Sequence, residues 1–165
     1  MSATTTVLAA IQGTSLRTAI NAGLTAAGVP TFADPTVAHP MLLGVVGYAP
    51  RLPALAAHAR QIAGRPLATG HNVYQATLRV RFTAAIAHTT EAAAQNYGAI
   101  YIDVLRAVVM TKCHPGQASP VGGFEDIRWV GSDPDGTPFA NDTGVVSRQV
   151  TVEFDVIECI AAQTA

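Results

Sequence analysis

Two cysteines and five histidines are the residues best suited to chemistry, and their spacing matches no familiar catalytic arrangement. Cys113 and His114 are adjacent, so their side chains point in different directions, whereas a nucleophilic pair needs contact between thiol and imidazole. No G-x-S-x-G, P-loop or G-x-G-x-x-G sequence occurs. The histidines form no H-x-x-x-H pair for zinc; they are His39, His58, His71, His88 and His114. We therefore predict that the protein is not an enzyme and has no catalytic residue.

The cysteines are too few for a disulfide framework and lack the spacing of metal ligands. We interpret Cys113 and Cys159 as small core residues. A bridge between them remains open, should the end of a helix and the last strand be neighbours.

Oxygen-bearing side chains gather near the C-terminal end and could bind a hard cation; they are Asp133, Asp135, Asn141 and Asp142. The sequence does not match the EF-hand pattern, because Pro138 occupies the position that requires glycine and no glutamate occurs at the last position of the loop. The Asp-Pro and Asp-Gly dipeptides of residues 132–141 are typical of turns. We predict a hairpin turn, with no metal and no cofactor.

Arg79 and Arg81 alternate with apolar residues and so project from one face of a predicted strand. Such a stripe could contact nucleic acid, but no exposed aromatic interleaves with it for base stacking. We favour a solvated or subunit-pairing face. Glu153 and Asp155 on the last predicted strand could pair with these arginines across the sheet.

The composition favours burial against a partner. Of 165 residues, 49% are apolar and 13% charged, and the net charge is −1. A lone soluble domain usually carries more surface charge, so we expect part of this surface to be covered. No stretch approaches the roughly 18 apolar residues of a membrane span, residues 1–6 lack a basic signal region, and no basic run favours phosphate binding.

Hydrophobic periodicity predicts two main helices. One spans residues 5–27, weakened by Gly13, with Gly28 as the stop signal. In an alternative start, Thr14 or Ser15 is the N-cap and the first dozen residues are only loosely ordered. The other begins at Thr89 or Thr90 and ends near Lys112. A short helix at about 53–63 is predicted inside an insertion at about 48–72.

Apolar runs and alternation predict strands at 41–48, 72–88, 124–131 and 145–160, the last two forming a hairpin. The predicted fold is one α+β domain over residues 1–165. It has a mostly antiparallel sheet of about four strands with two main helices packed on one face, plus the short inserted helix.

This combination resembles the tail terminator family of long-tailed bacteriophages, the lambda-type tail completion proteins. The resemblance covers Leu16 to Phe32, which holds A-G-V-P-T-F, then Tyr74 to Val109, and Phe124 to Ile160, which holds V-T-V-E-F-D-V. It is one of pattern and length, and the insertion departs from it.

The resemblance implies a virion protein, assembled in the host cytoplasm, that forms a homohexameric ring at the junction of tail and neck. Its partners would be copies of itself, the tail tube protein and a neck or head-completion protein, with DNA passing through the lumen without specific binding and no membrane contact. Loops 115–123 and 132–144 are predicted to reach neighbouring subunits or the tube. The predicted interface residues are Val121, Gly122, Gly123, Phe124, Asp133, Asp135, Phe139, Arg79 and Arg81.

Two alternatives remain open. One is another virion component, either a neck or head-completion protein or a tail tube subunit. The other is a small α/β enzyme or ligand-binding module.

Overall fold

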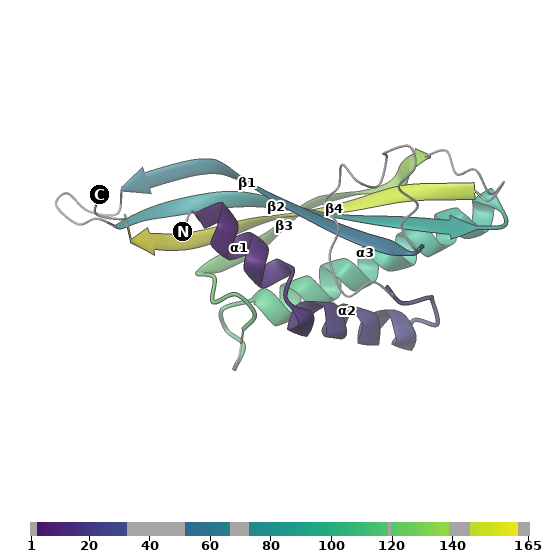
Figure 1. Ribbon diagram of the computed structural model, residues 1–165, viewed down its shortest axis with the longest axis horizontal. Coiled ribbons are helices and arrows are strands. Elements are labelled where there is room, and N and C mark those ends of the chain that lie inside the picture. The colour runs from purple at the N-terminus through teal and green to yellow at the C-terminus, as the bar shows by residue number, and fades with distance from the viewer. Residues whose placement is uncertain (1–2, 33–51, 67–72, 119, 139–145, 162–165) are drawn as a thin grey trace.

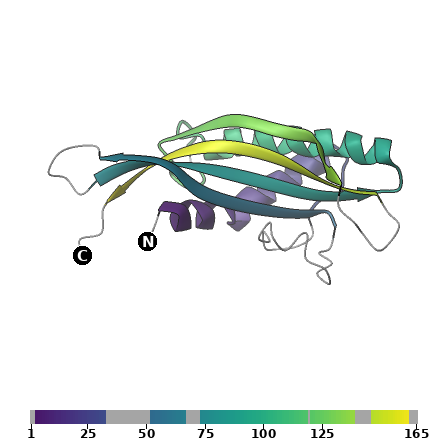
Figure 2. The same cartoon turned by 90° about the horizontal axis from the view of Figure 1, so that it is seen from above.

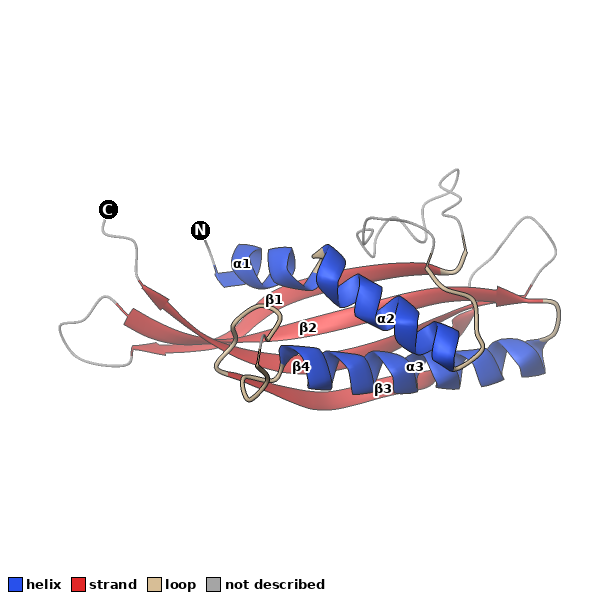
Figure 3. Ribbon diagram, turned by 90° about the horizontal axis from the view of Figure 1, so that it is seen from below, coloured by secondary structure: helices blue, strands red, loops and turns tan. Residues whose placement is uncertain are grey.

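The computed structural model describes residues 3–32, 52–66, 73–118, 120–138 and 146–161. Its elements, in chain order, are α1 (Ala3–Ile11), α2 (Thr14–Ala26), β1 (Ala54–Pro66), β2 (Val73–His88), α3 (Glu91–Cys113), β3 (Asp126–Pro138) and β4 (Val146–Ala161). The strands form one antiparallel sheet in the order β1-β2-β4-β3. The described helices lie together on one face of this sheet (Figures 1 and 3). The predicted α+β class, with a four-stranded antiparallel sheet, is confirmed.

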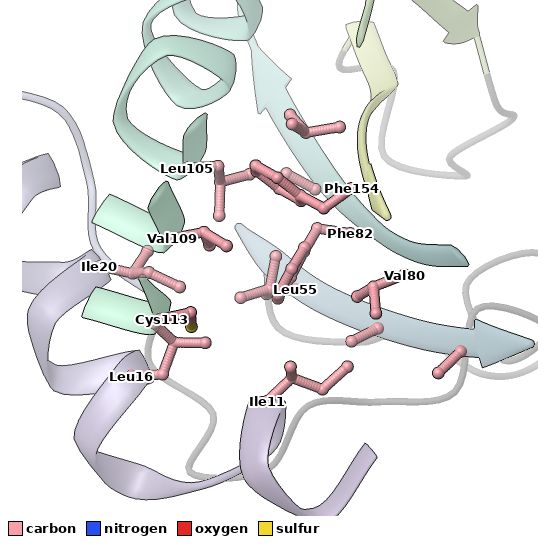
Figure 4. Packing of buried hydrophobic residues seen from close by; sticks show 14 of the residues in the cluster. Ile11, Leu16, Ile20, Leu55, Val80, Phe82, Leu105, Val109, Cys113 and Phe154 are labelled. Carbon is pink, nitrogen blue, oxygen red and sulfur yellow. The ribbon is translucent and has the colours of Figure 1, made fainter. Parts of the chain in front are cut away.

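The central strands β2 and β4 follow the predicted alternation. Val80 and Phe82 on β2 are buried on the helix-covered face, as are Val152 and Phe154 on β4. The rings of Phe82 and Phe154 meet edge to face, with centroids 6.0 Å apart (Figure 4). The apolar residues of both strands therefore form the surface on which the helices pack. The polar residues that alternate with them point to the opposite face of the sheet.

The long helix α3 begins as its sequence predicts. The Thr90 side chain accepts a hydrogen bond from the Ala93 amide at 3.3 Å, and Glu91 occupies the first turn. A Cβ at Gly98 would come 2.9 Å from Val150 Cγ1, so glycine at this position allows α3 to lie close to β4. The buried stripe of α3 consists of Ala94, Gly98, Tyr101, Ile102, Leu105, Val109 and Cys113.

The predicted helix at 5–27 is broken into α1 and α2 around Gly13, which is extended at φ −62° and ψ 152°. α2 begins at Thr14, close to the alternative start, but its N-cap is Gly13 and not the predicted Thr14 or Ser15. It ends as predicted at Gly28, with φ +73°. The Gly28 amide donates to the Thr25 carbonyl at 3.0 Å and the Val29 amide to the Leu24 carbonyl at 3.1 Å, which is a Schellman motif.

The short helix predicted at 53–63 is wrong, because these residues form the edge strand β1. Leu55, Ala59 and Ile62 have helical spacing, but alanine is small enough to fit either period. Hydrogen bonding to β2 decides the outcome, from Ala54 opposite Ala85 to Pro66 opposite Tyr74. The predicted strand at 41–48 lies outside the described residues.

The turn predicted at 132–141 is wrong for its first part. β3 runs on to Pro138 and the ladder shifts register between Asp133 and Thr137, so the turn-forming residues form an irregularity within the strand. Residues 139–145 lie outside the described part of the chain. The hairpin of the last two strands is confirmed, because β3 pairs antiparallel with β4.

Candidate functional site

The outer face, defined as the face of the sheet opposite the helices, carries cross-strand ion pairs. Arg79 lies opposite Asp155, with Nε to Oδ1 at 2.8 Å and a second guanidinium nitrogen to Oδ2 at 3.0 Å. Arg81 lies opposite Glu153, with Nε to Oε1 at 2.7 Å. The hydrogen bond to Asp155 raises the pKa of Arg79. The cross-strand pairing predicted from the sequence is confirmed, and it holds both arginines along the sheet.

A shallow depression of about 100 Å³ lies beside these pairs and is lined by His58, Arg60, Arg79, Arg81 and Glu153. Its lining is cationic, yet Arg81 and Arg79 are each already held by a carboxylate. The depression thus accommodates water or one small anion.

At one end of the outer face a polar chain runs across the sheet. Arg65 donates to Gln75 at 3.0 Å, and Gln75 donates to Glu125 at 3.1 Å. Hydrogen bonds from Cys159 and Gln75 lower the pKa of Glu125, and the bond to Glu125 raises the pKa of Cys159. Both shifts favour the protonated thiol of Cys159 over its thiolate.

Cys113 lies on the opposite side of the sheet, within the core beside Leu16 and Ile20 of α2 (Figure 4). Burial raises the pKa of its thiol to about 11. The imidazole of the adjacent His114 accepts a hydrogen bond from the Gly116 amide at 3.0 Å. Both cysteines are free, so the open question of a bridge is answered. Cys113 is the core residue that was predicted, whereas Cys159 belongs to the outer face.

The two edge strands carry exposed apolar side chains that the sequence did not reveal. Within the described sheet, β1 and β3 each have one hydrogen-bonded neighbour. β1 has a bulge between Gln61 and Ala63, and β3 has one between Trp129 and Gly131. Among the described residues, the exposed large hydrophobic side chains are those of Ile62, Trp129 and Val130, at 43%, 44% and 41% exposure.

Each of these three side chains therefore lies at or beside a bulge on an edge strand. Figure 2 shows β1 and β3 along opposite sides of the sheet. A bulge interrupts the alternation of faces, which is why a period-two reading of the sequence could not find these positions. Trp129 is steadied from the helix side by Arg106, whose guanidinium lies 5.2 Å from the ring centroid.

The structure does not bring the predicted interface residues into one site. Arg79 and Arg81 lie at the middle of the outer face, and Asp133 is exposed on β3. Asp135 lies in β3, but its side chain and the whole of Phe139 are outside the described residues.

The predicted residues in the loop before β3 have roles within their own chain. The Val121 amide donates to the Lys112 carbonyl at 2.8 Å, which ties the loop to the end of α3. Phe124 is buried at 2% exposure, and a Cβ at Gly122 would fall 2.3 Å from its ring. Gly122 and Gly123 have φ values of +89° and +60°, so glycine is needed at both to form this turn.

No group of three or more metal-ligating side chains occurs in the described part of the chain; Asn141 and Asp142 of the predicted cluster lie outside it. None of the described helices is long and apolar enough to cross a membrane. No protein-family model and no curated protein sequence matches the chain. The geometry of the sheet is therefore the basis for a functional proposal.

Proposed function

We propose that this protein is a structural subunit that assembles with copies of itself into a ring, and that the ring caps the tail tube of a long-tailed bacteriophage, as tail terminators do. The ring would stop polymerisation of the tube and join the tail to the neck. Interface geometry does this work, because one face of the ring matches the last tube subunits and the other does not.

The observation that supports self-assembly most directly is the exposure of large apolar side chains on opposite edges of one sheet. Ile62 projects from β1, and Trp129 and Val130 from β3. Scattered apolar residues are ordinary on protein surfaces, but an exposed tryptophan beside a valine on an edge strand of the described sheet favours pairing with another chain. A charged fraction of 13% agrees with a surface that is partly covered in the assembled state.

Two unlike edges favour a head-to-tail contact. When β3 of one copy meets β1 of the next, every copy still presents one unused edge of each kind. Such a heterologous contact propagates until it closes into a ring or continues as a filament. A dimer that pairs like edges would instead leave Trp129 or Ile62 uncovered.

A tail tube subunit is the second candidate, and the same edges favour it. The described sheet has four strands of 13 to 16 residues, and its outer strands β1 and β3 each pair with one described strand, so such a sheet can continue from neighbour to neighbour. The terminator and the tail tube subunit differ in whether their assemblies keep growing. The terminator forms a closed ring of fixed mass, whereas a tube subunit stacks into fibres of indefinite length.

Light scattering on concentrated protein is the first test. Six copies of 17.1 kDa give a ring of about 103 kDa that does not grow with concentration. Electron microscopy of particles made without the gene is the second test, and overlong tubes without heads are the expected result. Tails of normal length in its absence would refute the terminator role. Substrate turnover by a monomer that requires Cys113 or a histidine would favour the enzyme alternative.

A further inference from the structure

We propose that β3 of one copy pairs antiparallel with β1 of the next copy, in a register set by their two bulges, so that one sheet runs through the assembly. This inference rests on the proposed self-assembly and names the surface that carries it. The occupant of each open edge is thus a second copy of the same chain.

Strand direction permits this contact. The sheet contains four strands, and each is antiparallel to its neighbour. Because the number is even, β1 and β3 at the two edges run in opposite directions. A second copy related by a rotation about an axis near the strand direction therefore presents its β1 antiparallel to β3, and the alternation continues across the contact.

The faces of the sheet then restrict the register. Opposite residues must lie on the same face, because a slip of one residue turns every side chain over. The pairing with β2 places residues on the outer face on both sides of the β1 bulge, and those nearest to it are His58, Arg60, Ala63 and Arg65. The pairing with β4 likewise places residues on the outer face on both sides of the first β3 bulge, and those nearest to it are Asp126, Arg128, Gly131 and Asp133.

Each bulge reverses the parity of its strand, so the two bulges must lie side by side if outer residues are to meet outer residues on both sides of them. Two registers satisfy this condition. In one, Arg65 lies opposite Arg128, and Ile62 lies opposite Gly131. In the other, Arg65 lies opposite Asp126, and Ile62 lies opposite Trp129.

Charge and apolar contact both select the second register. The first register places Arg65 opposite Arg128, a like-charge pair that destabilises a strand pair, although it also places Arg60 opposite Asp133. The second register has no like-charge pair, and Arg65 attracts Asp126, whose carboxylate also binds Arg128 of its own chain at 2.8 Å. Ile62 would cover Trp129, which is the larger of the exposed apolar groups on β3. On the outer face the facing pairs become Arg65 with Asp126, Ala63 with Arg128, Arg60 with Gly131, and His58 with Asp133.

Disulfide trapping tests this register directly. Ala63→Cys and Arg128→Cys are placed together in a Cys159→Ser chain, and the protein is oxidised at high concentration. Within one chain β1 and β3 are three strand spacings apart, about 14 Å, which no disulfide can span. Directly opposite residues of two copies lie about 4.5–5.5 Å apart between Cα atoms, which is within reach.

The expected result is a ladder of covalent multimers on a non-reducing gel, ending at the size of the ring. Arg65→Cys with Arg128→Cys is the matched control, because it is opposite only in the rejected register. Absence of multimers would overturn the proposal, as would a control pair that cross-links as well. Dimers from Ala63→Cys alone would overturn it too, because they would mean that like edges meet.

Charge reversal provides an independent measurement. Asp126→Arg is expected to weaken assembly about tenfold or more, and Arg65→Asp in the same chain to restore it. An effect through folding alone would not be rescued by the second change. Assembly that is indifferent to both variants, or a monomer that instead binds a peptide of another protein along β1, would contradict the inference.

The two proposals can fail separately. Rings of about six copies that form without the cross-link between positions 63 and 128 would keep the structural function and remove this interface. Cross-linked assemblies in a phage whose tail length does not depend on the protein would keep the interface and remove the terminator role.

Discussion

The buried thiol of Cys113 makes stability depend on alkaline pH in a way that can be calculated. Its pKa is about 11 in the folded protein, against an ordinary value of 9.0, because burial penalises the thiolate. Because the pKa of this thiol is higher in the folded than in the unfolded chain, the protonated thiol contributes to the free energy of unfolding. This contribution is fully present below pH 9 and is lost as the pH rises through 11. Two pKa units correspond to about 2.7 kcal/mol, and about 2 kcal/mol of this is lost by pH 11.

The perturbation is Cys113→Ala, which removes the titrating group. At pH 8 the variant is expected to be less stable by about 1 kcal/mol, because a small buried side chain has been shortened. At pH 11 the order is expected to reverse, with the variant more stable by about 1 kcal/mol, because only the natural protein has lost the contribution of the thiol.

Urea unfolding under reducing conditions, followed by circular dichroism from pH 8 to pH 11, measures both free energies. Tyr101, whose pKa burial also raises, is present in both proteins, so its contribution cancels in the difference. Stability curves that remain parallel across this range would refute the reasoning. Rapid labelling of Cys113 by a thiol reagent in the folded protein at pH 8 would refute its burial.

Three further predictions concern single contacts. The hydroxyl of the buried Tyr101 donates to the carbonyl of Pro30, which is an exposed residue, so Tyr101→Phe is expected to cost about 0.5–1.5 kcal/mol. The melting temperature should fall by about 2–4 °C for each kcal/mol, and an unchanged thermal melt would contradict this. Gly28→Ala places a side chain at φ +73° and is expected to lower the free energy of unfolding, measured with urea, by about 1–2 kcal/mol. Gly131→Ala is the control and should cost less, because a Cβ at Gly131 would have no heavy atom within 4 Å. Arg79→Asp should lower the urea midpoint of unfolding, and adding Asp155→Arg in the same chain should recover part of the lost stability. If the effects of the two changes simply add, the pair is not coupled.

Some features of the fold could be predicted because their causes lie within a few residues. The alternation around Phe154 and around Val80 is the pattern of a strand with one buried face, and both strands have it. Thr90 caps α3 through a bond to its own helix, and Gly28 ends α2 because of its own backbone conformation. Such local causes can be read directly from sequence.

The errors occurred where local patterns were ambiguous. Alanine favours a helix in the segment that became β1, and the pairing of this segment with β2 overrode that preference. The Asp-Pro and Asp-Gly dipeptides of residues 133–136 predict a turn. Pairing with β4 resumes at Thr137, so these residues form an irregularity within β3. The predicted interface residues in the loop before β3 were also ambiguous from the sequence. Gly122 and Phe124 pack against each other within their own chain.

The sequence alone determined the face on which each central strand is apolar and the limits of the long helix. It showed that Glu153 and Asp155 could pair with Arg79 and Arg81, and the register of the sheet decided which carboxylate binds which arginine. Only the tertiary structure decided that β1 and β3 are the two edges and that Ile62 and Trp129 emerge there on bulges. The physical reason is that a side chain's face depends on its own strand, whereas edges and bulges depend on which distant segment supplies the hydrogen bonds.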